Sequence, residues 1–441
     1  MIEPTNRHIL RGQVLSFRDD PFLVGPDAAI QFESDGAVLI ENGTIRRVGP
    51  AQPIIAEHPR VVVESYTRDI IMAGFVDCHV HYPQYEVIAS YGEQLLEWLN
   101  RYTFPAELKF DDSEYARQAA EFFLDECLRN GTTTASVYAT VHPQSVDAFF
   151  TAAQARGMCM ATGKVMMDRG APDGLIDTPQ SGFDQSKALL EKWHGRDRLK
   201  YAVTPRFAVT STHAQLEAAG ALWRAHPTAL MQTHLSENAA EIALVGELFP
   251  ETTDYFGVYE QFGLVGKGSN FGHAIHLTDR ERQAFRTTGS GISHCPTSNL
   301  FLGSGLFDME DLRDSSADIP IGLATDIGGG SSLSMLRTMC ASYEVCRLNG
   351  YNLHPAKAFY LATCGSARTM LLDNRIGNVE AGKDAELIVL DLRSTPAIAN
   401  RMQFVEDIWD VLFVQMMMAD DRAIRAAYIG GKKQYMRPSA Q

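Results

Sequence analysis

The sequence predicts an α/β protein with one (β/α)8 barrel of the TIM type and a small β-domain built from both ends of the chain. The 441 residues suffice to bury a large core, and one barrel with an accessory domain fits this length. Strand-like and helix-like segments alternate through the middle, which indicates a parallel sheet covered by helices. Strand and turn signals dominate both ends. We therefore expect residues 1–70 and 376–441 to form the β-domain and residues 71–375 to form the barrel.

The expected β-domain begins with a hairpin signal. Asn42-Gly43 lies within the apolar stretch of residues 37–48, and Asn-Gly in this setting favours a two-residue hairpin turn. Residues 385–391 and 424–432 near the other end have the same strand-like character. Because an isolated two-stranded hairpin is only marginally stable in water, we expect the two ends to pair with each other.

The predicted barrel contains eight segments with the length and apolar character of buried strands. Amphipathic stretches lie between them, such as residues 114–130, which Gly131 closes as a helix C-cap would, and residues 144–155. Eight strands over this length suit a (β/α)8 barrel. Residues 306–318 are polar and irregular, and we expect a loop or a short helix there. The strand candidates are residues 70–79, 133–141, 158–166, 199–207, 229–235, 269–275, 290–295 and 320–326.

The composition excludes several classes of partner. A formal net charge of -15 argues against nucleic acid, because phosphate binding needs clustered lysine and arginine. No run approaches the roughly 20 apolar residues that span a membrane, and the first residues lack a basic region followed by an apolar one. The seven cysteines are scattered, without a Cys-x-x-Cys pair, which suits a reducing compartment. We expect a cytoplasmic protein that binds neither nucleic acid nor a membrane.

Polar residues recur where the predicted barrel strands end. The first strand ends in His79 and His81. Residues two apart on a strand point to the same face, so both imidazoles can reach one metal ion. Each of these polar groups alone could be an ordinary core or loop residue, but reactive groups of barrel enzymes lie at strand ends, and five such ends indicate a site. The other four strand ends are Thr204-Pro205-Arg206-Phe207, His234-Leu235-Ser236-Glu237, Gly272-His273-Ala274-Ile275-His276 and Ala324-Thr325-Asp326.

The first strand end and three strings that follow it carry a family resemblance. Asp77-Cys78-His79-Val80-His81 after an apolar strand resembles the first metal-binding strand of the amidohydrolase superfamily, which implies a composite β-sandwich for the terminal domain. Ala73 and Cys78 replace the usual proline and threonine of that pattern, but neither supplies an essential ligand. The resemblance covers nearly the whole chain and is most specific for the guanine deaminase family. The strings that carry it are His81-Tyr82-Pro83-Gln84, Gly-Glu-Gln-Leu-Leu-Glu-Trp-Leu at residues 92–99 and Tyr-Thr-Phe-Pro-Ala-Glu at residues 102–107.

The residues at the strand ends suit a catalytic metal site. His79, His81 and His234 supply three neutral nitrogens and Asp326 supplies one oxygen. Three or four such ligands with an open position make a catalytic rather than a structural zinc site. We expect one zinc ion per subunit, and iron also suits this ligand set. A bound metal lowers the pKa of its water towards roughly 7, and Asp326 is suited to take a proton from that water.

Glu237 and His273 complete the expected chemistry. Glu237 follows His234 by three residues, so the two share a face if the chain turns into a helix there. The carboxyl of Glu237 can then protonate a ring nitrogen of the substrate while the hydroxide attacks the adjacent carbon. The alternative for Glu237 is an acid at a helix N-terminus that interacts with the helix dipole. His273 can donate a hydrogen bond to the hydroxide or the intermediate, and we expect a structural role for His276.

The resemblance also implies an activity. Guanine deaminases are hydrolases of a cyclic amidine C–N bond that convert guanine to xanthine and ammonia in purine catabolism. The family implies the catalytic and metal-binding roles given above, guanine as the small-molecule substrate, and a homodimer. It further implies which residues contact the base. These are His81, Tyr82, Pro83, Gln84, Arg206, Phe207, His234, Leu235, Ser236, Glu237 and Asp326.

Two of these residues predict the choice of base. Arg206 carries only hydrogen-bond donors, so it suits a purine edge with a carbonyl, whereas Gln84 can present a donor or an acceptor. If both hold the C6 carbonyl of guanine, C2 is left facing the hydroxide. The alternative for Arg206 is an ion pair with a nearby carboxylate.

Other functions fit parts of the sequence. A two-metal ring hydrolase of the dihydroorotase type bridges its metals with a modified lysine, and Lys164 lies at a strand end. The later strings fit a one-metal deaminase better, so we expect a solvated or salt-bridged Lys164. A non-enzymatic assembly protein on this barrel would have lost ligands that are present here. The fold alone does not choose between guanine and other purine, pyrimidine or triazine substrates. We expect Cys295 to be structural and residues 328–330 to form a flexible loop.

Overall fold

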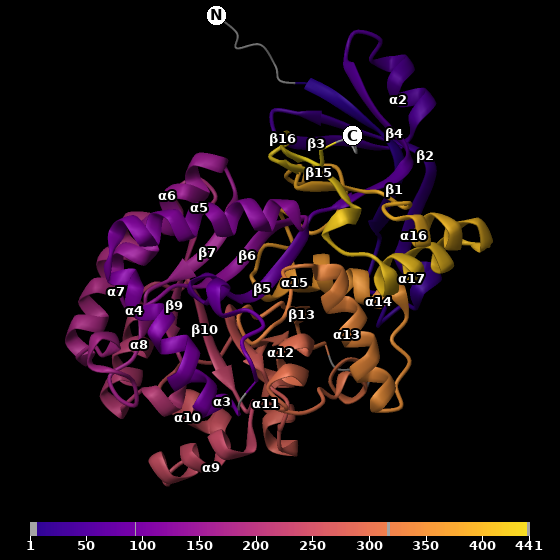
Figure 1. The fold of residues 1–441 in the computed structure, drawn as a ribbon. Coiled ribbons are helices and arrows are strands. Elements are labelled where there is room, and N and C mark those ends of the chain that lie inside the picture. The colour runs from indigo at the N-terminus through magenta and orange to yellow at the C-terminus, as the bar shows by residue number, and fades with distance from the viewer. Residues whose placement is uncertain (1–6, 93, 315–317, 439–441) are drawn as a thin grey trace, which may run out of the picture.

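The computed structural model describes residues 7–92, 94–314 and 318–438, which form a barrel and a smaller sheet (Figure 1). The sheet lies at one end of the barrel, and β10 points away from it (Figure 1). The carboxyl ends of the parallel barrel strands therefore face the opposite side, where α3, α9 and α10 lie. Among the described residues, no helix has both the length and the apolar character needed to cross a membrane.

Both ends of the chain meet in one mixed sheet, as predicted. Its order is β16-β15-β14-β4-β1-β2-β3, and β4 pairs with β14 across more than 300 residues of sequence, with Ala73 opposite Leu387. The Asn-Gly signal is confirmed, because Asn42 (φ 51°) and Gly43 (φ 81°) form the two-residue turn between β2 and β3. The strands of this sheet are β1 (Arg7–Phe17), β2 (Ile30–Glu41), β3 (Thr44–Pro50), β4 (Val62–Ala73), β14 (Leu387–Leu390), β15 (Ile424–Ile429) and β16 (Lys432–Met436).

The barrel is a parallel sheet whose strands match seven of the eight predicted segments closely. Their order is β13-β12-β11-β10-β9-β7-β6-β5, with the short β8 paired to β9. The segment predicted at residues 158–166 is broken at Lys164 into β7 and β8. The strands are β5 (Phe75–His81), β6 (Thr132–Tyr138), β7 (Cys159–Gly163), β8 (Val165–Met166), β9 (Lys200–Pro205), β10 (Leu230–Leu235), β11 (Ser269–His273), β12 (Gly291–His294) and β13 (Ile321–Leu323).

The first predicted barrel strand, residues 70–79, is wrong in its first half. Residues 70–73 belong to β4 of the terminal sheet, and β5 begins only at Phe75. Gly74 makes the junction, where an added Cβ would lie 2.2 Å from the hydroxyl oxygen of Thr133. The apolar run is continuous because both strands are buried, so hydrophobicity alone does not reveal the change of sheet. The division of the chain at residues 70/71 and 375/376 stays a prediction.

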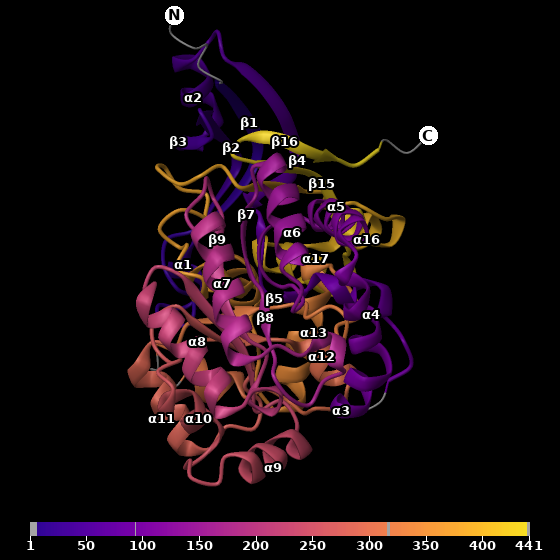
Figure 2. The same ribbon diagram turned by 90° about the vertical axis from the view of Figure 1, so that its left-hand side faces the viewer.

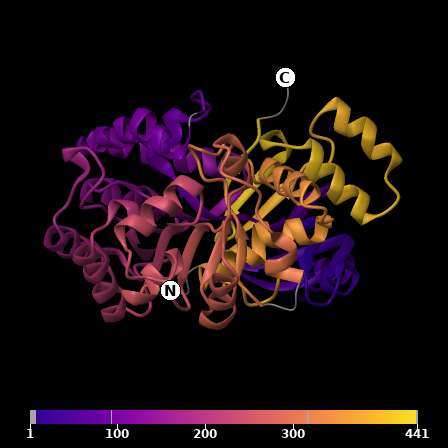
Figure 3. The same cartoon turned by 90° about the horizontal axis from the view of Figure 1, so that it is seen from below.

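Helices surround the barrel strands, and Figure 2 shows α7 and α8 on one outer face, where both pack on β9. The two predicted helices are confirmed as α5 and α6, and Gly131 follows α5 in the left-handed conformation (φ 77°). The polar stretch at residues 306–318 contains a short helical turn, Glu310–Asp314, and its residues 315–317 lie outside the described structure. Seen from below, the C-terminal helices project to one side (Figure 3).

The principal helices are α3 (Leu95–Trp98), α4 (Phe104–Leu108), α5 (Ser113–Arg129), α6 (Pro143–Arg156), α7 (Pro179–Trp193), α8 (His213–Ala225), α9 (Ala239–Leu248), α10 (Tyr255–Gln261), α11 (Asp279–Thr288), α12 (Pro296–Phe301), α13 (Met335–Leu348), α14 (Pro355–Tyr360), α15 (Ser366–Thr369), α16 (Pro396–Arg401) and α17 (Ile408–Met418), with α1 (Pro26–Ala29) and α2 (Ala51–Glu57) near the terminal sheet.

The barrel closes between β5 and the segment that follows β13. The backbone N–H of Asp326 donates to the carbonyl of His79 (3.0 Å), and the N–H of His81 donates to the carbonyl of Ile327 (2.9 Å). The buried carboxylate of Asp77 accepts from the backbone N–H of Thr325 (3.1 Å), bonds to its hydroxyl, and accepts from the N–H of His79 (3.3 Å). Asp77 therefore ties the first and last strands together at the level of the candidate site.

We expect Asp77→Ala to destabilise the protein. The substitution leaves the N–H of Thr325 and the N–H of His79 without this acceptor, and one buried unsatisfied group costs about 1–3 kcal/mol. The free energy of unfolding, measured by urea titration, should fall by at least that amount. Asp35→Ala is the matched control, because Asp35 pairs with Arg11 at the surface, and it should change the midpoint little. Equal stability of the two variants would show that Asp77 does not hold the closure.

Candidate active site

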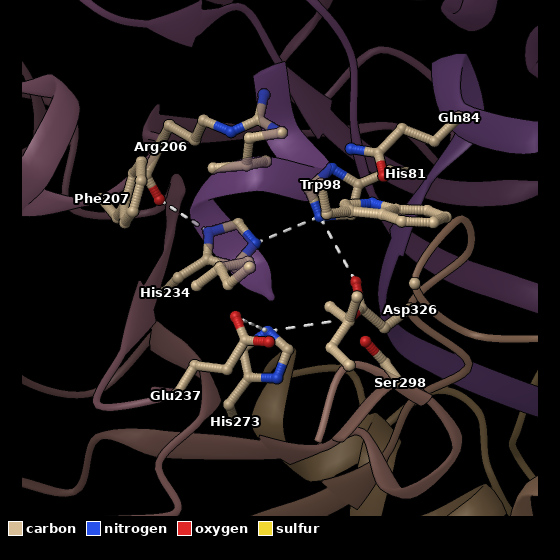
Figure 4. Close-up of a pocket in the computed structure, with 14 residues that line it drawn as sticks. His81, Gln84, Trp98, Arg206, Phe207, His234, Glu237, His273, Ser298 and Asp326 are labelled. Carbon is tan, nitrogen blue, oxygen red and sulfur yellow. Dashed lines mark hydrogen bonds and ion pairs between the residues drawn. The ribbon is translucent and has the colours of Figure 1, made fainter. Parts of the chain in front are cut away.

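Five polar residues converge at the carboxyl end of the barrel, and Figure 4 labels His81, His234, His273 and Asp326 among them. His79 and His81 end β5, His234 lies in β10, His273 ends β11, and Asp326 follows β13. All five are buried. His273 (φ 68°) and Asp326 (φ 49°) have left-handed backbone conformations, which are uncommon for residues other than glycine and cluster at functional sites.

The side chains of these five residues point at one another. The carboxylate of Asp326 lies 3.3 Å from Nε2 of His79, 3.4 Å from Nε2 of His81 and 3.7 Å from Nε2 of His273. Nε2 of His81 lies 3.2 Å from Nε2 of His234. The strand ends thus bring together every metal ligand that the sequence predicts.

This cluster contains a group that can hold a metal ion. His79, His234, His273 and Asp326 each offer one ligand atom, and these atoms lie within 4.8 Å of one another. The group includes His273, for which the sequence predicted a hydrogen-bonding role, and it does not include His81. His81 still touches both His234 and Asp326, so its role as a ligand stays a prediction.

Burial sets the charge of the candidate ligands. It lowers the pKa of His79, His81 and His234, so these imidazoles are neutral and have a lone pair for a metal. Nδ1 of His234 lies 2.7 Å from the carbonyl oxygen of Arg206. A proton on Nδ1 satisfies that carbonyl and leaves Nε2 free to bind a metal. Nε2 of His79 has no hydrogen-bond partner among the described residues, as expected for an atom that awaits a ligand.

The carboxyl of Asp326 is ionised. Burial acts to raise its pKa, but the neighbouring imidazoles, that of His79 first and then that of His273, outweigh burial and lower the pKa to about 2. His273 shifts the other way. Burial acts to lower its pKa, but Glu237 and Asp326 outweigh it and raise the pKa. The site therefore contains an anionic oxygen, neutral nitrogens and one imidazole that favours the protonated form.

Glu237 faces the same cluster. Burial raises its pKa to about 7, its Oε1 accepts from the hydroxyl of Ser304 (3.0 Å), and its Oε2 lies 3.4 Å from Nε2 of His273. A buried carboxyl with a pKa near neutrality can serve as a general acid and base.

The predicted reason for the placement of Glu237 is wrong. Glu237 lies in the connection between β10 and α9, not on a helical turn with His234. Ser236 redirects the chain there with a left-handed backbone (φ 48°). The role at the helix N-terminus belongs instead to Glu241, whose carboxylate accepts from the N–H groups of Glu237 and Asn238.

A pocket opens beside this cluster. Among the described residues, four of the expected contacts do not line this pocket: Tyr82, Pro83, Leu235 and Ser236. Tyr82 instead points its hydroxyl to the carbonyl of Ser145 (2.7 Å). The expected contacts that do line the pocket are His81, Gln84, Arg206, Phe207, His234, Glu237 and Asp326.

Several further residues of the pocket had no role in the sequence-based prediction. Leu95, Trp98, Leu99 and Leu302 form an apolar wall, and Ser298 places a buried hydroxyl with no partner among the described residues. The string at residues 92–99 contains three of these apolar side chains, but their exposure to a pocket depends on packing that the string does not reveal.

Arg206 forms the ion pair that the sequence left as an alternative. Its Nη1 donates to both carboxylate oxygens of Glu107 (2.8 Å each). Arg206 also lines the pocket, so the ion pair and a contact with a substrate are compatible.

The lysine of the two-metal alternative is occupied elsewhere. Lys164 is fully buried and forms a salt bridge with Asp177, as the one-metal interpretation expects. Cys295 is buried, its thiol donates to the carbonyl of Ser293 (3.3 Å), and burial raises its pKa well above the ordinary value. His276 bonds to the carbonyl of Ser304 (2.7 Å). These contacts fit structural roles for Cys295 and His276.

Such a donor set at the open end of a (β/α)8 barrel is typical of metal-dependent hydrolases. The amidohydrolase family model matches residues 70–432, a range that includes every strand of the barrel and every strand end of the site. The chain belongs to the amidohydrolase family.

The chain is similar to guanine deaminases over nearly its whole length. It is 46% identical to the guanine deaminase of Escherichia coli (strain K12) over 411 residues, which are 93% of each chain. The solved structure of E. coli guanine deaminase matches with a TM-score of 0.95 and 44% identity and covers 98% of this chain and 100% of that one. A guanine deaminase from C. acetobutylicum with guanine bound in its active site matches with a TM-score of 0.88 and 26% identity, covering 98% of this chain and 100% of that one.

We expect the purified protein to hold one metal ion per chain. His234→Ala should lose most of this metal, because it removes a buried nitrogen at the centre of the cluster. His276→Ala should retain the metal, because His276 is exposed and bonds elsewhere. Elemental analysis of both variants and the parent protein measures this directly. Two ions per chain in the parent would instead favour the two-metal alternative.

Proposed function

We propose that this protein is a guanine deaminase, which hydrolyses guanine at C2 to xanthine and ammonia. The observation that carries this proposal is the arrangement of one pocket. Hydrogen-bond donors on Arg206 and Gln84 lie on its wall together with the metal-binding cluster and Glu237. A purine that places its C6 carbonyl on the donors can place C2 at the cluster. The similarity to guanine deaminases over both full chains supports the same conclusion.

We assign one zinc ion to the cluster, and iron suits the same ligands. The neutral imidazoles of His79 and His234 and the ionised carboxylate of Asp326 fit either metal. His81 is the further candidate for coordination, whereas we assign His273 a hydrogen-bonding role. When bound, such an ion activates a water for attack at neutral pH.

The protein residues then move the protons. Asp326 is ionised and accepts a proton from the attacking water. Glu237, whose pKa is about 7, can be protonated at neutral pH and donates to a ring nitrogen beside C2. His273 favours its protonated form and donates a hydrogen bond to the oxygen that joins C2. Asp326 then returns its proton to the amino group at C2, Glu237 takes the proton of the hydroxyl that joined C2, and the C2–N bond breaks with release of ammonia.

The proposal includes the finer expectations of a homodimer and a cytoplasmic location. The family resemblance supports the dimer, and the scattered thiols, including the buried Cys78, Cys127 and Cys159, support a reducing compartment. The enzyme would act in purine catabolism.

The activity can be tested with a panel of bases. We expect ammonia release from guanine and far slower release from adenine, cytosine and a triazine, because only guanine offers a carbonyl to Arg206 and an amino group at C2. A chelator should abolish the activity and zinc should restore it. Full activity of a demonstrably metal-free preparation, or comparable rates on guanine and adenine, would contradict the proposal.

Glu237→Gln should keep the metal and lose most of the turnover. The substitution preserves shape but removes the ionisable proton, and general acid–base steps contribute typically about 10²–10⁴-fold. Steady-state kcat with guanine and elemental analysis test the two parts separately. Glu251→Gln is the matched control, since Glu251 is exposed and pairs with His213, and its kcat should equal that of the parent. Loss of metal from the Glu237 variant would make Glu237 a ligand instead.

A further inference from the structure

Glu107 lies behind the donor end of the pocket. It belongs to the short helix α4, its exposed fraction is 0%, and that of Arg206 is 2%. Its carboxylate accepts two bonds from Nη1 of Arg206 (2.8 Å each) and one from Nε2 of Gln84 (3.2 Å). Glu107 is thus a buried anion that holds both residues assigned to the recognition of the base.

The contacts of Gln84 fix the orientation of its amide. Its Nε2 donates to Glu107, and its Oε1 accepts from the backbone N–H of Gly328 (3.2 Å). The flipped amide would set oxygen against the carboxylate and nitrogen against the N–H of Gly328, so both bonds would be lost. The sequence left open whether Gln84 presents a donor or an acceptor. With its amide held in this orientation, Gln84 still offers its second N–H as a donor.

Arg206 offers only donors as well. Glu107 occupies Nη1, and the described residues provide no hydrogen-bond acceptor for Nε or Nη2. A buried guanidinium without a counter-charge would attract anionic ligands strongly. Because Glu107 neutralises it, this end of the pocket is a donor surface without net charge. Such a surface suits the carbonyl of a neutral base rather than a phosphate or a carboxylate.

We propose that Glu107 is a positioning residue that makes the site select 2-amino-6-oxopurines over 2,6-diaminopurines. This inference rests on the proposed deaminase function and deepens it. Glu107 acts through Gln84 and Arg206 by holding their N–H groups towards the C6 substituent. A C6 carbonyl accepts hydrogen bonds from these donors. A C6 amino group would instead point its own N–H groups at them, so no hydrogen bond would form.

Three substrates distinguish a role of Glu107 in recognising the C6 substituent from a purely structural role. Guanine, 2,6-diaminopurine and 2-aminopurine all carry the C2 amino group that is replaced, and they differ at C6 by a carbonyl, an amino group and a hydrogen. We expect the parent enzyme to prefer guanine to 2,6-diaminopurine in kcat/KM by about 10⁴–10⁵. 2-Aminopurine makes no hydrogen bond at C6, so its slow turnover does not depend on Glu107.

Glu107→Gln is the first variant to measure. The new amide at position 107 has one acceptor oxygen, which bonds to Arg206. Its NH2 group then donates to the side-chain oxygen of Gln84. The amide of Gln84 therefore flips, and its oxygen replaces the N–H group at the pocket. We expect kcat/KM for guanine to fall about 10–100-fold, as for a lost bond to a charged group, and the preference over 2,6-diaminopurine to narrow at least as much. Turnover of 2-aminopurine and the metal content should not change.

Two further variants complete the test. Glu97→Gln is the matched control, because Glu97 is exposed on the neighbouring helix α3, and it should leave all three rates unchanged. Glu107→Asp keeps the charge beside Arg206 but shortens the reach to Gln84, and we expect a preference between those of the parent and Glu107→Gln. If Glu107→Gln does not fold, the preference measured for Glu107→Asp still tests the proposal.

The outcomes are distinct. If the parent enzyme releases no ammonia from guanine, the proposed function fails and the inference fails with it. If guanine is deaminated but the folded Gln or Asp variant keeps the parental preference, the inference alone is overturned. An equal loss on all three substrates would also overturn it, since that is the signature of a merely structural carboxylate.

Discussion

The site depends on the closure of the barrel between β5 and the segment after β13. Asp77 bonds to Thr325, and the backbone of Asp326 bonds to that of His79. These contacts join residues almost 250 positions apart. Without them the histidines of β5 and the carboxylate of Asp326 would belong to separate edges of an open sheet. The metal-binding group is therefore a product of the fold as a whole and not of any one motif.

The sequence predicts the barrel well because its strands are short, apolar and followed by polar residues. It fails where tertiary structure overrides local pattern. The apolar run through Gly74 contains two strands of different sheets, and only the close approach of Thr133 marks the break. The helical spacing of His234 and Glu237 gave a correct residue for an incorrect reason, since Ser236 turns the chain before any helix begins.

Some residues of the candidate site could be predicted from the sequence and others could not, because tertiary packing places only some of them independently of a local pattern. Candidate ligands such as His79 and Asp326 lie at strand ends, whose position follows from the barrel. Three residues of the apolar wall (Leu95, Trp98 and Leu99) and Glu107 come from the irregular helical segment of residues 95–108, which long-range packing places against the barrel. A carboxylate between apolar neighbours in that segment was visible in the sequence. Its partner, Arg206, lies 99 positions away, and no local pattern reveals such a pair.

Burial links the proposed recognition of the base to the proposed chemistry in this pocket. The side chains of Leu95, Trp98 and Leu302 offer an apolar surface to a flat base. Burial in the same enclosure keeps imidazoles such as that of His234 neutral and raises the pKa of Glu237 to about 7. It also makes an unpaired cation costly, which is why Arg206 needs a buried counter-charge. A pocket opened to solvent would weaken all of these effects together. Burial is thus a common cause of the neutral imidazoles among the candidate ligands and of the raised pKa of Glu237.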